Sequence, residues 1–166
     1  LAASPLIDLQ ARLFRVPLSE VMSDAKHGDH THFELVTVTI RDGEGREGTG
    51  YTYTGGFGGR AILAVVEHDL RPFLLGRDPA LVEDLHDAMQ WRLHYVGRGG
   101  IAGFAVSAVD IALWDLRGKA TERPLWRMAG ATSDRSQVYR GAIDLNFPLD
   151  RLLDNVRGYL AEGFEA

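Results

Sequence analysis

The sequence predicts an α+β protein with a three-stranded antiparallel sheet, a helical bundle, and then the first strand and helix of a parallel α/β unit. Apolar and polar residues alternate in the stretches before residue 54, which is typical of half-buried strands. Apolar segments with helical spacing occupy residues 60–130. Residues 136–162 combine a strand pattern with an amphipathic helix, which is typical of the start of a parallel βα repeat.

The three strands of the sheet are expected at residues 7–16, 33–41 and 48–54. The second and third strands are separated by DGEG at residues 42–45, which predicts a hairpin turn. The first and second strands are separated by the polar segment 17–31, which we interpret as a loop.

Two helices are expected before the most apolar part of the chain. The glycine-rich run GGFGG leads into a helix at residues 60–70, with Pro72 near its end. Asp78 followed by Pro79 is typical of a helix start, and the second helix is expected to extend to about residue 95.

The most informative stretch is GGIAGFAVSAVDIALWDLRGKATERPLWRMAG at residues 99–130. Its first part is apolar nearly all round at helical spacing, which predicts a buried helix. Gly118 and Lys119 close this helix, and Pro124 starts a short second helix that ends at Gly130.

Two acids, Asp110 and Asp115, interrupt the apolar run. Residues five apart on a helix diverge by about 140°, so these carboxylates do not face each other as a catalytic pair would. A carboxylate in apolar surroundings is costly unless it is hydrogen-bonded. We therefore expect both acids to be structural and to accept hydrogen bonds from nearby backbone or arginine.

The C-terminal part predicts a strand at residues 136–145 and a helix at residues 148–162 that Gly163 caps. Residues 164–166 look like the approach to another strand. One strand and one helix have no sheet of their own to join, so this part is expected to be the beginning of a larger domain.

Composition excludes several classes of partner. The net charge is −5 and no block of lysine or arginine is present, so neither nucleic acid nor an anionic membrane is an expected partner. No apolar run approaches the roughly 18 residues that span a bilayer, and no signal peptide is recognised at the start. The chain has no cysteine, which excludes zinc–thiolate sites and fits a cytoplasmic protein.

The segment HGDHTH, from His27 to His32, gathers three imidazoles and one carboxylate. It permits a metal site, a loop that contacts a polar ligand, or a solvated loop. In an extended chain only His30 and His32 share a face, and no pair is spaced for a helix, so a solvated loop is favoured over a metal site.

The glycines at residues 56–61 fit the spacing G-x-G-x-x-A of a dinucleotide-binding turn. That motif requires a buried parallel strand before it, whereas GYTYT is polar and belongs to a hairpin. Dinucleotide binding is therefore not expected. The remaining alternatives are an anion site at the N-terminus of the following helix and a glycine-rich turn without a ligand.

The block SAVDIALWDLRGKATERPLWRMAG resembles the end of the capping domain in the enolase superfamily, on the mandelate racemase/muconate lactonizing enzyme branch. VTVTIRDGEGREGTGYTY resembles the hairpin of that domain, and LLGRDP its loop before the second helix. VYRGAIDL and PLDRLLDNVRGYLAEGFEA resemble the first strand and helix of its (β/α) barrel. The resemblance implies a capping domain at residues 1–132 and an incomplete TIM-like barrel at residues 133–166.

The resemblance implies chemistry that depends on Mg²⁺. Family members bind a carboxylate substrate on the metal, remove the proton alpha to the carboxylate and stabilise an enediolate. The metal-binding acids lie on later barrel strands, and a K-x-K base motif follows a phrase like GFEA. No catalytic residue and no metal ligand is therefore expected in this chain, and the segment alone is not expected to be active.

SDAK in the first loop and GYTYTGG in the second resemble galactarate/talarate dehydratases. The resemblance thus favours an acid-sugar dehydratase that takes a small carboxylate or acid-sugar substrate. The alternatives are a racemase, epimerase or cycloisomerase on the same scaffold, and a non-catalytic capping or binding module. A homo-oligomer is expected, because oligomers are common on this scaffold.

In this family the two loops of the capping domain contact the distal part of the substrate. By match to these loops, the expected substrate-binding residues are Lys26, His27 and Tyr53, with Thr54 as a neighbour. Asp144 lies near the C-terminal end of the first barrel strand, where barrel active sites form. A role for Asp144 as a loop cap is favoured slightly over substrate binding.

Overall fold

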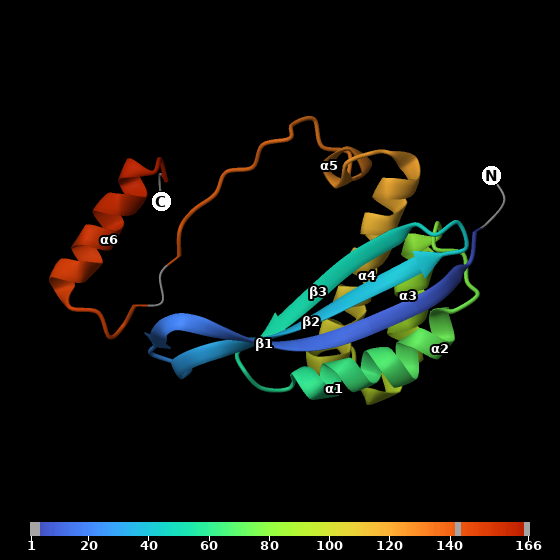
Figure 1. The fold of residues 1–166 in the computed structure, drawn as a ribbon, viewed down its shortest axis with the longest axis horizontal. Coiled ribbons are helices and arrows are strands. Elements are labelled where there is room, and N and C mark those ends of the chain that lie inside the picture. Colours follow the sequence, from blue (N-terminus) through green and yellow to red (C-terminus); the bar gives the residue numbers. More distant parts are fainter. Residues whose placement is uncertain (1–3, 142–143, 165–166) are drawn as a thin grey trace.

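Strands β1 (Leu6–Asp24), β2 (Gly28–Asp42) and β3 (Glu47–Thr54) form one antiparallel sheet in the order β1-β2-β3, which confirms the predicted sheet. The computed structural model describes residues 4–141 and 144–164. Helices lie against one face of the sheet, and β1 and β2 continue beyond the end of β3 as a two-stranded arm (Figure 1). The arm comprises residues 16–33.

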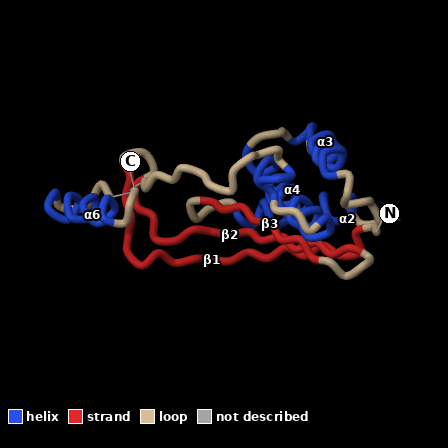
Figure 2. The backbone as a smooth tube through the Cα atoms, turned by 90° about the horizontal axis from the view of Figure 1, so that it is seen from above, coloured by secondary structure: helices blue, strands red, loops and turns tan. Residues whose placement is uncertain are grey.

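The arm corrects the expectation of a loop at residues 17–31. Pro17 pairs with His32, and after a shift in register the pairing resumes at Met22 and His30. Only residues 25–27 form a turn. The polar side chains suggested a loop, but strand pairing satisfies the backbone groups of the paired residues whatever the polarity of their side chains. Both strands reach the far end of the arm side by side (Figure 2).

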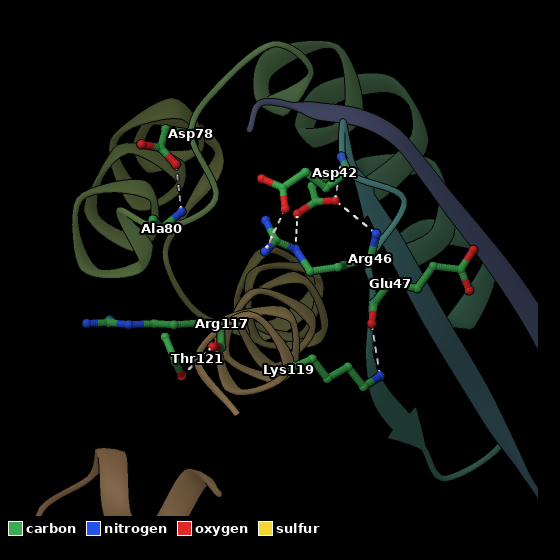
Figure 3. A network of polar contacts seen from close by, with 9 residues as sticks. Asp42, Arg46, Glu47, Asp78, Ala80, Arg117, Lys119 and Thr121 are labelled. Atoms are coloured by element: carbon green, nitrogen blue, oxygen red, sulfur yellow. Dashed lines mark hydrogen bonds and ion pairs between the residues drawn. The ribbon is translucent and has the colours of Figure 1, made fainter. Parts of the chain in front are cut away.

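The turn between β2 and β3 is held by a buried carboxylate. Asp42 is 1% exposed and accepts hydrogen bonds from the backbone N–H of Glu44 at 3.0 Å and of Arg46 at 2.9 Å. The Nε of Arg46 donates to the same carboxylate at 2.7 Å (Figure 3). These bonds close the hairpin turn that DGEG predicts.

A continuous helical segment follows β3 and covers the sheet. It consists of α1 (Gly59–Ala64), the π-helix η1 (Val65–Leu70) and α2 (Arg71–Leu74). The helix predicted at residues 60–70 is thus present and extends four residues further, through Pro72.

Helix α3 (Val82–Arg92) is followed by the short 3₁₀ helix η2 (His94–Val96). The predicted helix is confirmed, but its start at Asp78 is wrong. The Oδ1 of Asp78 accepts the N–H of Ala80 at 2.9 Å in a separate turn, so the motif ends before the helix begins.

Helix α4 (Gly100–Thr121) and the short α5 (Leu125–Met128) confirm the two helices predicted within residues 99–130. In the described residues α4 is buried on one face only, which corrects the expectation of burial nearly all round. The sheet and the neighbouring helices cover one side, and several apolar side chains of α4 lie exposed on the other: Ile101, Phe104 and Ile111. No helix of the described residues is long and apolar enough to cross a membrane.

Helix α4 packs directly on the backbone of β3 because two glycines face it. A Cβ at Gly50 would overlap the carbonyl oxygen of Ala108, and a Cβ at Gly48 would overlap that of Ala112. Strand and helix therefore approach more closely than any side chain at these two positions would permit.

The two acids of α4 act structurally, as predicted. The Oδ2 of Asp115 accepts the N–H of Thr49 at 2.7 Å and the Nζ of Lys119 at 2.8 Å. Lys119 also donates to the carbonyl oxygen of Glu47, at 2.9 Å (Figure 3). Asp110 lies 3.1 Å from the Nδ1 of His86, so its partner is a histidine rather than backbone or arginine.

In the described part of the predicted strand at residues 136–145, only Asp144 forms a β-bridge, with Ser23, and no continuous strand is present. Residues 136–141 have no regular structure, and residues 142–143 lie outside the described residues. A strand needs a neighbouring strand for its backbone hydrogen bonds, and the described residues place none beside residues 136–141. Helix α6 (Leu149–Ala161) forms as predicted and lies apart from α1–α5 (Figure 1). The domain boundary at residues 132–133 stays a prediction, as does the next strand, since residues 165–166 are outside the described residues.

Candidate functional site

The turn at the tip of the arm is built around Asp24. Its Oδ1 accepts the backbone N–H of Lys26 at 2.8 Å and of His27 at 2.7 Å. Asp is favoured at such a position because its short side chain can hydrogen-bond the backbone two and three residues on. Gly28 completes the turn with a φ of 74°, a conformation that glycine adopts without strain. Lys26 and His27 are therefore held at the end of the arm.

Asp24 also lies against two imidazoles. Its Oδ2 is 3.1 Å from the Nδ1 of His27 and 3.0 Å from the Nε2 of His30. The N–H of His27, the ring of His30 and the N–H of Lys26 hold the pKa of Asp24 well below its ordinary value. The carboxylate is consequently ionised throughout the neutral range.

A row of rings connects the tip to the end of β3. The rings of His30 and Phe33 are stacked with centroids 5.9 Å apart. Phe33 in turn meets Tyr53 edge to face at 5.8 Å. Tyr53 remains 58% exposed, so its ring is positioned by Phe33 while much of the side chain faces solvent.

The glycine-rich turn after β3 packs against the same histidine segment. A Cβ at Gly56, whose φ is 100°, would lie 3.2 Å from the ring of His32. At the N-terminus of α1, the N–H of Gly59 donates to the Oε2 of Glu34 at 2.7 Å, and Thr54 donates to the same oxygen at 3.4 Å. The anion at this helix start is therefore the protein's own Glu34. The preceding strand is antiparallel, as predicted, so the turn lacks the parallel strand that a dinucleotide-binding motif requires.

Asp144 lies beside the arm. It forms a parallel bridge with Ser23, and the N–H of Leu145 donates to the carbonyl oxygen of Ser23 at 3.1 Å. Ser23 immediately precedes Asp24. The structure thus places Asp144 near the turn that carries Lys26, although these residues are far apart in the sequence.

Of the five predicted site residues, the structure gathers Lys26, His27 and Asp144 at the outer part of the arm, and it connects Tyr53 to them through the row of rings. Thr54 instead donates a hydrogen bond to Glu34 at the base of the arm.

Sequence reasoning missed Asp24 and His30 as partners of His27 in the turn. An acid directly before a short turn that contains histidine was the available signal, and reading the segment as an extended loop concealed it.

Among the described residues, Asp24, His27 and His30 form the one group of three potential ligands close enough to hold a metal ion. Two imidazoles and one carboxylate do not fit Mg²⁺, which prefers oxygen ligands in octahedral geometry. No step that needs Mg²⁺ can therefore be assigned to this group.

A three-stranded antiparallel sheet with helices on one face, ending in α4 and α5, is the arrangement that the resemblance implies for an enolase-superfamily capping domain. Residues 25–130 match the family model described as the mandelate racemase/muconate lactonizing enzyme N-terminal domain. The chain belongs to this family, which confirms the resemblance seen in the sequence.

Curated relatives include enzymes of two kinds. The chain is 47% identical over 154 residues to the 3,6-anhydro-alpha-L-galactonate cycloisomerase of Streptomyces coelicolor, covering 93% of this chain and 43% of that protein. It is 35% identical to the L-talarate/galactarate dehydratase of Salmonella typhimurium, covering 85% of this chain and 37% of that protein. The chain therefore spans less than half the length of these relatives.

Solved structures of related proteins have the same fold. A racemase from Streptomyces coelicolor with bound magnesium superposes with a TM-score of 0.94 at 45% identity, covering 97% of this chain and 45% of that one. The Salmonella typhimurium dehydratase with magnesium and L-lyxarohydroxamate gives a TM-score of 0.89 at 32% identity, covering 98% and 43%. Both homologous structures thus contain magnesium.

Proposed function

We propose that the full-length protein is a Mg²⁺-dependent enzyme that removes the proton alpha to the carboxylate of a small acid sugar, and that this segment supplies substrate contacts. The observation that carries the proposal is the 47% identity to an acid-sugar cycloisomerase across 93% of this chain. The arm tip and the end of β3 correspond to the two loops that the family resemblance assigns to the distal part of the substrate.

Two outcomes of the reaction are candidates, and each has its own support. Cycloisomerisation is supported by the higher identity, 47%. Dehydration is supported by the 35% identical talarate/galactarate dehydratase and by the likeness of SDAK and GYTYTGG to such enzymes. Both outcomes begin with loss of the proton alpha to the carboxylate, so that step is the core of the proposal.

Lys26 is the central substrate contact in this proposal. Its ammonium group, on an exposed residue at the end of the arm, pairs with a distal carboxylate or hydroxyl of the substrate. In the described residues no hydrogen-bond partner is seen for its Nζ, so a substrate oxygen displaces only water there. His27 lies next in the same turn and contributes a second polar contact.

Tyr53 packs on the carbon chain of the substrate or donates a hydrogen bond from its hydroxyl group. Phe33 fixes the ring at 5.8 Å, so little rotamer freedom is lost when a ligand binds. Thr54 is a neighbour of this contact, and Asp144 borders the site from the side of Ser23.

The test is to incubate the full-length protein and Mg²⁺ with a panel of aldarates and 3,6-anhydro-aldonates, followed by proton NMR and mass spectrometry. We expect one acid sugar to lose its alpha proton signal and give a 2-keto product. Loss of one water identifies a dehydratase, and unchanged mass identifies a cycloisomerase. Recovery of an epimer of the substrate, without a 2-keto product, would identify a racemase or epimerase instead of either enzyme. If no member of the panel exchanges its alpha proton, the catalytic proposal is wrong and a binding module is favoured.

A further inference from the structure

We propose that the arm tip binds a zinc-type divalent transition-metal ion through Asp24, His27 and His30. This site is separate from the magnesium of the homologous structures and does not depend on the proposed reaction. Each residue offers one ligand atom, and these atoms all lie within 4.8 Å of one another. The three residues come from the end of β1, the turn and the start of β2, which the hairpin brings together.

The spacing of the ligand atoms matches a tetrahedral ion. The Oδ2 of Asp24 is 3.1 Å from the Nδ1 of His27 and 3.0 Å from the Nε2 of His30. In a zinc site with bonds of about 2.0–2.1 Å, neighbouring ligand atoms are about 3.3 Å apart. The two Asp24 distances need to widen by only a few tenths of an ångström, and the ligand atoms of His27 and His30, which lie within 4.8 Å of each other, complete three corners of a tetrahedron when His27 adjusts. A water molecule takes the fourth corner.

The backbone holds the carboxylate in the orientation that the ion needs. Two N–H groups of the turn occupy the Oδ1 of Asp24, at 2.8 and 2.7 Å, which leaves Oδ2 directed at the imidazoles. The side chain of His30 is 12% exposed, and its ring is stacked on Phe33. These two ligands are therefore in place before an ion binds, and only His27, which is 64% exposed, has freedom to adjust.

The donor set selects the class of ion. Imidazole nitrogen suits Zn²⁺, Co²⁺ and Ni²⁺, whereas Mg²⁺ requires oxygen ligands. The charge of Asp24 favours a cation. Each imidazole now donates an N–H to Asp24, so ion binding moves that proton to the other ring nitrogen or to solvent and leaves a lone pair for the ion. A bound ion would join β1 to β2 across the turn and so fix the backbone that carries Lys26.

The experiment titrates the metal-free full-length protein with Co²⁺ in excess Mg²⁺, so that the magnesium site is already filled. Tetrahedral Co²⁺ gives intense visible absorption bands, and calorimetry with Zn²⁺ gives the stoichiometry. We expect one ion per chain. His30→Gln and Asp24→Asn should each weaken binding by more than about tenfold. Asn keeps an Oδ1 that accepts the turn N–H bonds, so the second variant removes the charge while retaining the turn.

The matched control is His32→Gln. His32 lies two residues beyond His30 in the same strand, but its Nδ1 contacts Thr31 and Arg15 rather than Asp24. We expect this variant to bind Co²⁺ like the wild type. The proposal would be overturned if the wild type did not bind Co²⁺ in excess Mg²⁺. It would also be overturned if His30→Gln bound Co²⁺ as tightly as the wild type, or if His32→Gln abolished binding. Acid-sugar turnover is a separate measurement, so failure of this site leaves the proposed function standing.

Discussion

Each hairpin turn of the sheet begins with an aspartate that accepts backbone N–H bonds. Asp42 serves the β2–β3 turn and is buried, whereas Asp24 serves the β1–β2 turn and is partly exposed. The β2–β3 turn could be predicted because its two glycines mark it. The β1–β2 turn was missed, because Asp24 is the one signal before it and the residues AKH that follow are not typical of a turn. The aspartate and the pairing across the arm make that turn, and the pairing is not a local property of the sequence.

Asp42→Asn is expected to lower the free energy of unfolding by about 2 kcal/mol, because it weakens charge-assisted hydrogen bonds at a buried position. Urea unfolding of the full-length protein measures the change. Glu44→Gln is the control: Glu44 is exposed and contacts Arg46 at 3.0 Å, so its loss should cost little. Equal effects of the two substitutions would contradict the assigned role of Asp42.

The stabilisation by Asp42 is expected to depend on pH. Burial alone would raise the pKa of Asp42, but the hydrogen bonds and charge of Arg46 outweigh burial, and the pKa is lowered. A carboxylate with a lowered pKa in the folded state stabilises the protein above the unfolded value of about 4 and loses this effect as the pH falls further. The stability difference between the wild type and Asp42→Asn should therefore shrink below about pH 4. A constant difference in urea titrations from pH 7 to pH 3 would disprove this.

At the scale of single elements, predictions succeeded where a pattern is local. The periodicity of α4 and α6 and the alternation of β2 lie within each element, and all three form near the expected residues. The arm was predicted as a loop and forms paired strands. The segment 136–141 was predicted as part of a strand and has no regular structure. Whether a segment becomes a strand depends on a partner strand, which the residues of the segment do not specify.

The contact of β3 with α4 provides a test at this scale. Gly50→Ala should lower the free energy of unfolding by about 2–3 kcal/mol, since its Cβ has no space between the strand and the backbone of α4. Thermal unfolding measures this. Gly158→Ala in α6 is the control: apart from its own helix backbone and chain neighbours, no atom of the described residues lies within 4 Å of its added Cβ, and alanine favours a helix. If Gly50→Ala is as stable as the wild type, strand and helix are not in direct backbone contact.

At the scale of the whole molecule, one block of sequence was enough to predict the family. SAVDIALWDLRGKATERPLWRMAG specifies the helix whose buried face rests on β3, its end and the short helix after it. The candidate site was predicted in part. Lys26, His27 and Tyr53 followed from the family resemblance, whereas Asp24 and His30 required the pairing of the arm. That the arm tip contacts an acid sugar remains our proposal.

The chain contains only two lysines, and they allow a direct comparison. Lys119 is engaged by Asp115 at 2.8 Å and by the carbonyl oxygen of Glu47 at 2.9 Å, far from the arm tip. The two lysines therefore share a charge but differ in the role that we assign to them: Lys26 to the substrate, Lys119 to the fold.

The decisive measurement is steady-state kinetics of the full-length protein on its acid-sugar substrate, with Lys26→Ala and Lys119→Ala side by side. We predict that Lys26→Ala lowers kcat/KM by about tenfold or more, mainly through KM, because a charge-assisted contact is worth at least about 1.5 kcal/mol. Lys26→Arg should recover part of this loss. Lys119→Ala should leave the kinetics unchanged. Unaltered kinetics in Lys26→Ala would contradict the account, because the arm tip would then not contact the substrate.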